Sequence, residues 1–85
     1  MSLKVTLNEF LALPRDKQFD AIFTIGDYLE TRTQDNSQVI LYAVDRFFVE
    51  LYFDPKINKI NNINAFENGK NLNKYSKNLK GILKF

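Results

Sequence analysis

The segment QVILYAVDRFFVELYFD, residues 38–54, decides the fold. It joins two apolar runs through the charged pair Asp45-Arg46. Both runs are rich in β-branched and aromatic residues, which favour strands, and a two-residue connection between such runs is typical of a β-hairpin. The segment therefore predicts two neighbouring antiparallel strands, around which the rest of the chain is arranged.

Two helices are expected before this hairpin. Residues 6–9 have the Thr-x-x-Glu spacing of a capping box and predict a short helix, which should end near Leu13 because Pro14 disfavours helical geometry in the residue before it. Pro14 suits the first turn of a second helix, and Gly26 is placed to end that helix as a left-handed cap residue. Apolar residues recur at helical spacing in both segments: Leu7, Phe10 and Leu11, then Phe19, Ile22 and Phe23.

The flanking residues predict two more strands and a last helix. Alternation of period two over 27–34 indicates a half-exposed strand. The Pro-containing stretch 54–58 predicts a turn, and the Asn-rich stretch 59–66 an edge strand whose imperfect alternation allows a bulge. Residues 72–79 predict a short C-terminal helix, since apolar residues recur there at helical spacing.

This order of elements predicts a single α+β domain over residues 1–85, in which two N-terminal helices pack on one face of a four-stranded antiparallel meander. Eighty-five residues provide one core, and 45% hydrophobic with 14% aromatic residues is a globular composition. The chain shows neither a signal-peptide pattern nor an apolar run of membrane-spanning length. We therefore expect a cytoplasmic protein without a membrane segment.

Residues that carry chemistry are scarce. The chain has no cysteine and no histidine, so the usual zinc sites and nucleophilic triads cannot be built. Glu30 and Glu50 share a predicted sheet face and could act as paired carboxylates, but we interpret them as a solvated surface pair because nothing near them in sequence predicts burial. There is no glycine-rich phosphate loop and no calcium-loop spacing. We expect no enzyme activity, cofactor, metal site or small-molecule substrate.

The sheet face opposite the helices is the candidate interaction face. With two-residue loops it would carry a mainly apolar set of side chains: Tyr28, Val39, Leu41, Phe48, Glu50 and Tyr52. An antiparallel sheet normally shows polar residues on its free face, so this face predicts association, most simply as a homodimer with two-fold symmetry. In the competing interpretation, residues 82–85 fold over this face within one chain.

Lysine is concentrated near the C-terminus. Residues 68–85 hold five Lys and no acid, a net charge of +5, whereas residues 1–67 hold seven Lys and Arg against ten acids, a net charge of −3. With the aromatic face, the five lysines are possible nucleic-acid contacts: Lys70, Lys74, Lys77, Lys80 and Lys84. The acids in that face and the lack of an RNP-type motif argue against this. The sequence thus predicts a small non-enzymatic protein-interaction module that self-associates, with weak nucleic-acid binding as the alternative.

Overall fold

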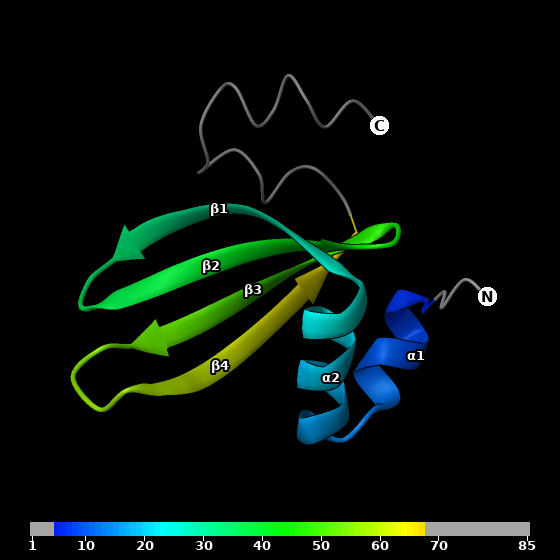
Figure 1. Cartoon of the computed structure of the whole chain (residues 1–85), viewed down its shortest axis with the longest axis horizontal. Helices are drawn as coiled ribbons and strands as arrows, with labels where there is room; N and C mark the ends of the chain where they lie inside the picture. The colour runs from blue at the N-terminus through cyan, green and yellow to red at the C-terminus, as the bar shows by residue number, and fades with distance from the viewer. Residues whose placement is uncertain (1–4, 68–85) are drawn as a thin grey trace.

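The computed structural model describes residues 5–67, which form two helices followed by four strands. In chain order these are α1 (Leu7–Ala12), α2 (Arg15–Ile25), β1 (Gly26–Gln34), β2 (Ser37–Val44), β3 (Phe47–Asp54) and β4 (Lys59–Phe66). The strands make one antiparallel sheet in the order β1-β2-β3-β4, and both helices pack on the same side of it (Figure 1). The α+β meander is therefore confirmed, whereas the helix predicted over 72–79 lies outside the described residues.

The central hairpin forms as predicted. Val44 pairs with Phe47 across the turn, and the ladder continues without interruption to Gln38 and Phe53. Asp45, the first turn residue, has a backbone φ of 55°, a left-handed conformation that Asp tolerates better than most residues. No helix among the described residues is long and apolar enough to cross a membrane.

The capping box of α1 is present. The backbone N–H of Glu9 donates to Thr6 Oγ1 at 3.1 Å, and the backbone N–H of Thr6 donates to Glu9 Oε1 at 3.0 Å. The side chain of Gln18, in α2, donates to the carbonyl oxygen of Phe10 at 3.0 Å. This bond ties the two short helices together where α1 ends.

Gly26 plays a different part from the one predicted. Its φ is −80° and its ψ 144°, so it is extended and the expectation of a left-handed cap is wrong. A Cβ atom built at this position would lie 2.3 Å from the carbonyl oxygen of Ile22. The chain turns directly from helix into strand here, and the close approach of backbone to backbone leaves no room for a side chain.

The main core fills the space between the helices and the sheet. Its buried members come from both helices and the central strands, and are Phe10, Ile22, Val44, Phe47, Val49 and Leu51. The rings of Phe10 and Phe47 join α1 to β3, with centroids 5.3 Å apart. The core residues that β2 and β3 supply all lie on one face of these strands, as the period of two predicts.

Each edge strand carries a bulge, whereas the ladder between β2 and β3 has none. In β1, Tyr28 pairs with Tyr42 and Glu30 with Leu41, which leaves Leu29 as the extra residue. In β4, Asn61 is the extra residue opposite Tyr52 and Phe53. Bulges at sheet edges disturb the row of unpaired backbone groups that another strand would need.

Replacement of Leu51 tests the assignment of the core. Leu51 is 1% exposed, so Leu51→Ala should lower the free energy of unfolding by about 2–5 kcal/mol through lost burial and the cavity left behind. Ile57→Ala is the matched control, since Ile57 is 58% exposed and its loss should cost under about 0.5 kcal/mol. Urea melts of both variants give the comparison. A cost below about 1 kcal/mol for Leu51→Ala would contradict the assignment.

The capping box predicts a pH dependence. The hydrogen bond from the Thr6 backbone, followed by that with the Thr6 side chain, lowers the pKa of Glu9 below its ordinary value of 4.5. Its stabilising effect is therefore present above the unfolded-state pKa and is lost as pH falls through the folded-state pKa. Unfolding free energies measured from pH 7 to pH 2 should fall less steeply in acid for Glu9→Gln. Parallel acid limbs would show that the carboxylate does not hold the box in solution.

Candidate interaction surface

The predicted interaction face is buried. Val39 and Leu41 are 0% exposed and Phe48 is 2% exposed, so the expectation of an exposed aromatic face is wrong. Phe48 stacks on Phe66 of β4 with ring centroids 5.6 Å apart, and Leu29 packs against the same cluster. This side of the sheet therefore has an apolar core of its own, while the alternative cover by residues 82–85 concerns residues outside those described.

The bulge in β1 moves Tyr28 to the other side of the sheet. Because Leu29 is the extra residue, Tyr28 shares the helix-bearing face with Tyr42, and the two rings meet edge to face at 6.1 Å. The prediction that Tyr28 lies beside Glu30 on the opposite face is wrong. A strict period of two cannot reveal a bulge, since one extra residue reverses the side on which every earlier residue lies.

Glu50 is buried and well satisfied. It is 0% exposed, so the interpretation as a solvated surface carboxylate is wrong. Asn64 of β4 donates to Oε1 at 2.9 Å, the half-buried Tyr52 donates to the same oxygen at 3.5 Å, and Arg32 of β1 forms an ion pair with Oε2 at 3.4 Å. A buried charge needs such partners, and these link three strands on the face opposite the helices.

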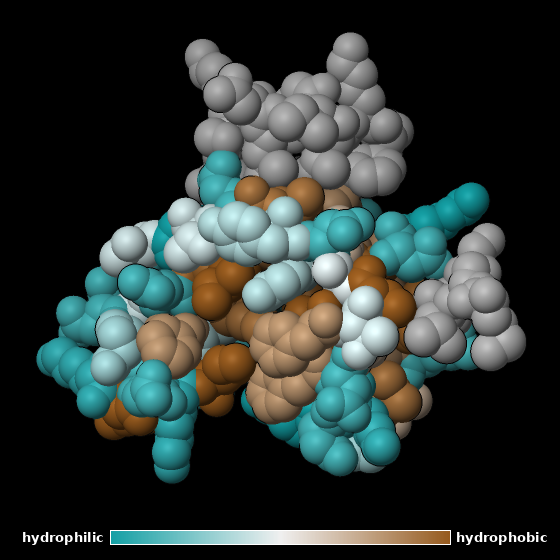
Figure 2. All heavy atoms as spheres, in the orientation of Figure 1, coloured by the Kyte–Doolittle hydropathy of each residue, from teal (hydrophilic) through white to brown (hydrophobic). Residues whose placement is uncertain are grey.

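An aromatic surface lies instead on the helix side. It consists of Phe19 and Phe23 on α2, Tyr42 on β2 and Tyr28 on β1. Phe19 stacks on Phe23 with centroids 6.3 Å apart, Phe23 meets Tyr42 edge to face at 6.1 Å, and Tyr42 meets Tyr28. Figure 2 shows hydrophobic side chains reaching the surface in the middle of this face. The rings form a continuous row across a helix and two strands.

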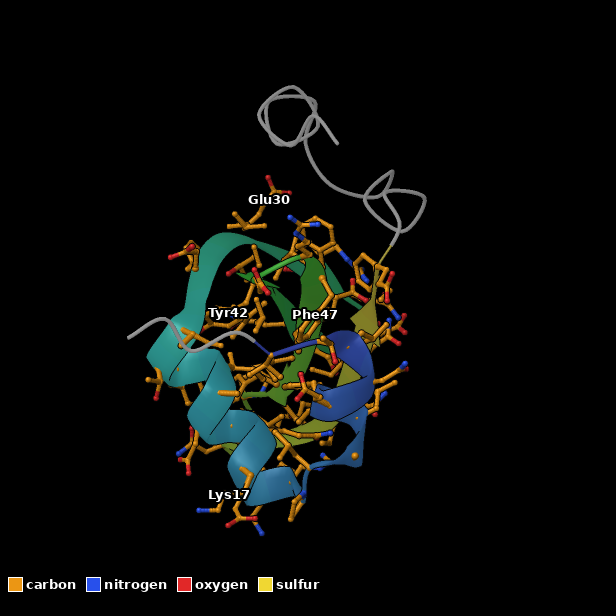
Figure 3. All side chains as sticks on the ribbon, turned by 90° about the vertical axis from the view of Figure 1, so that its right-hand side faces the viewer. Lys17, Glu30, Tyr42 and Phe47 are labelled. Carbon is orange, nitrogen blue, oxygen red and sulfur yellow. The ribbon has the colours of Figure 1, made fainter. Side chains whose placement is uncertain are left out.

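Two members of the aromatic surface are widely exposed. Phe23 and Tyr28 are each 59% exposed, as much as Leu11 and Ile57 at 58%, but only the first two belong to the row of rings. Tyr42 is half-buried, and its ring lies on the side of β2 that faces α2 (Figure 3). The hydroxyl of Tyr28 is hydrogen-bonded to Thr31 Oγ1 at 2.9 Å. The rings thus contact one another, and Tyr28 is also held by the side-chain hydroxyl of Thr31.

The sequence pattern had placed Phe19 and Phe23 in a buried helix stripe. Ile22 is 0% exposed, and Phe23 follows it by about 100° around the helix axis. Phe23 therefore lies on the flank of α2 rather than on its underside. The signal available in the sequence was that the apolar stripe of α2 is wider than the contact that one helix makes with a sheet.

Charge, cavity volume and the placement of acidic side chains argue against nucleic-acid, small-molecule and metal sites on the described residues. Residues 5–67 hold six Lys and Arg against ten Asp and Glu, a net charge of −4, and the five lysines considered for nucleic acid lie outside them. Two of the hollows lined by residues 5–67 have volumes of about 210 Å³ each, below the roughly 300–1,000 Å³ of small-molecule pockets. Within the described residues, no cluster of acidic side chains is placed to hold a metal ion. The aromatic surface is thus the strongest candidate site.

Comparisons with protein-family models, with curated proteins and with solved structures give no match.

The Glu50 network yields a prediction about stability. Glu50→Ala removes one partner of a buried ion pair and should lower the free energy of unfolding by about 3–5 kcal/mol. Glu50→Gln should cost less, because its amide oxygen still accepts the hydrogen bond from Asn64. Denaturant melts at pH 7 measure both variants. Equal losses for the two would contradict the role assigned to the carboxylate and its partners.

Proposed function

We propose that this protein is a small non-enzymatic interaction module that binds protein through the aromatic surface. The observation that carries the proposal is the row of four rings, with Phe23 and Tyr28 each 59% exposed. Aromatic residues are enriched in protein interfaces and among the residues that dominate binding energy. A cytoplasmic location belongs to the same proposal, and a chain without cysteine is compatible with a reducing compartment.

The contacts between the rings support binding rather than mere exposure. Edge-to-face ring pairs contribute about 0.5–1.5 kcal/mol beyond their buried area, and here they hold Phe23 and Tyr28 against Tyr42. A partner would therefore meet side chains that already pack against one another. Such preorganised aromatic groups bury large areas at a small cost in conformational entropy.

Nucleic-acid binding is the less favoured candidate. Affinity for a phosphate backbone depends on Lys and Arg contacts, and the part of the chain that presents the aromatic surface carries a net charge of −4. Base stacking alone would have to overcome this unfavourable charge. No observation on the described residues favours this alternative over protein binding.

A peptide library tests the proposal. Peptides are selected for binding to the immobilised wild-type chain, and most of them should bind at the surface that binds protein most readily. Phe23→Asp should lower the affinity of most of these peptides at least tenfold. Leu11→Asp is the matched control, because Leu11 is equally exposed but lies outside the aromatic surface. Affinities are measured by biolayer interferometry, with circular dichroism to check folding. Peptides indifferent to Phe23→Asp would show that the proposed surface is wrong.

A further inference from the structure

We infer that the partner of the aromatic surface is a peptide segment that presents an arginine or a lysine beside an apolar side chain. The basic side chain enters a hollow on the flank of α2, and the apolar side chain packs on Phe23 and Tyr28. This inference rests on the proposed function, since it names the chemistry of the partner that the same surface binds.

The α2 hollow adjoins the aromatic surface. It has a volume of about 210 Å³ and is lined by Val5, Asp20, Ala21, Thr24 and Ile25. Four of these residues belong to the C-terminal half of α2, and Val5 precedes α1. A hollow smaller than the usual small-molecule pocket suits a single side chain of a larger partner.

Asp20 lies between the α2 hollow and the aromatic surface. Successive residues of a helix are turned by about 100° around its axis. Phe23 therefore lies about 60° to one side of Asp20, while Thr24 and Ile25 lie about 40° and about 140° to the other side. A cation bound by the carboxylate of Asp20 is thus close both to the hollow and to the ring of Phe23, which is 59% exposed.

The walls of the α2 hollow match the stem of a long basic side chain. Val5, Ala21 and Ile25 are half-buried and supply apolar walls, whereas Asp20 and Thr24 are exposed. Arginine and lysine bury their aliphatic stems along apolar surface and keep the charged group in water. Apolar walls with one carboxylate at the rim provide for both parts of such a side chain.

The charge at this end of α2 favours a cation. The last turn of α2 contains no basic residue, so no side chain there offsets the partial negative charge of a helix C-terminus. Within residues 5–67 the ion pair is that of Arg32 with Glu50, and Asp20 takes no part in one. Lys17 lies toward the other end of α2, away from the junction with β1 (Figure 3). The carboxylate of Asp20 is therefore available to a partner.

Arginine fits this arrangement better than lysine. Its planar guanidinium can donate two hydrogen bonds to one carboxylate and can stack on an aromatic ring. A cation is attracted to a ring whose centre lies within about 6 Å. Asp20 and Phe23 are three residues apart in one helix, which brings their Cβ atoms to about 5–6 Å from each other. One guanidinium can therefore contact both side chains.

Synthetic peptides test the inference. The selected peptides that lose affinity for Phe23→Asp should carry arginine or lysine beside an apolar residue. Citrulline in place of that arginine, or acetyl-lysine in place of that lysine, should lower the affinity at least fivefold, because the ion pair and the cation–π contact are lost. Selected peptides without a basic residue, or neutral analogues that bind as tightly as their parents, would overturn the inference and leave the proposed function standing.

Variants of the full chain locate the cation. Asp20→Asn should lower the affinity for an arginine peptide at least fivefold and change that for its citrulline analogue less than twofold. Asp35→Asn is the matched control, since Asp35 is an exposed carboxylate in the β1–β2 turn. Isothermal titration calorimetry gives the affinities, with circular dichroism to check folding. Equal losses for the two peptides, or equal effects of the two variants, would overturn the inference.

A lysine introduced at the rim tests the α2 hollow itself. Thr24→Lys places an ammonium group where the partner's cation should bind, so it should lower the affinity for the arginine peptide at least fivefold. Thr33→Lys is the same change at an exposed position of β1 near the β1–β2 turn, and it should change the affinity less than twofold. A Thr24→Lys chain that folds and binds like Thr33→Lys would overturn the inference.

Discussion

The structure depends on the two-sided burial of the central hairpin. In β3 the five consecutive residues Phe47–Leu51 are all buried, so successive side chains that point to opposite faces are all removed from water. A strand of this kind must lie inside a sheet and have both of its faces covered. The helices cover one face, where the main core forms, and the cluster around Phe48 covers the other.

Glu50 stands in the middle of this buried run, and its partners explain how a carboxylate is tolerated there. Asn64 and Arg32 reach it from the strands on either side of the β2–β3 pair. Sliding one strand by a single residue would turn these partners to the other face and leave a buried charge without compensation. We therefore interpret the network as a device that fixes the register of the sheet rather than as a catalytic group.

The sequence was informative where a local rule decides the outcome. The capping box at Thr6, the hairpin at Asp45-Arg46 and the edge character of β4 each follow from a few neighbouring residues, and the structure contains all three. The sequence was misleading where an irregularity of the backbone determines on which face of the sheet a side chain lies or which conformation a residue adopts. The bulge at Leu29 moves Tyr28 to the helix side, and the direct passage from α2 into β1 gives Gly26 a steric role instead of a left-handed one. The burial of Glu50 depends on residues in distant strands, which no local pattern predicts. For the same reason, the aromatic surface could not be found from spacing alone.

The bulges on both edges also bear on how this chain can aggregate. The apolar runs of β2 and β3 have the composition of segments that stack into cross-β fibres, but in the folded molecule each lies between two paired neighbours and the outer strands are irregular. A native molecule is thus a poor template for adding further chains. Fibre growth would have to draw on opened molecules, so its rate is governed by the population of those molecules and by how fast they close again. For this fold, resistance to aggregation therefore depends both on the free energy of opening the sheet and on the rate at which it closes again.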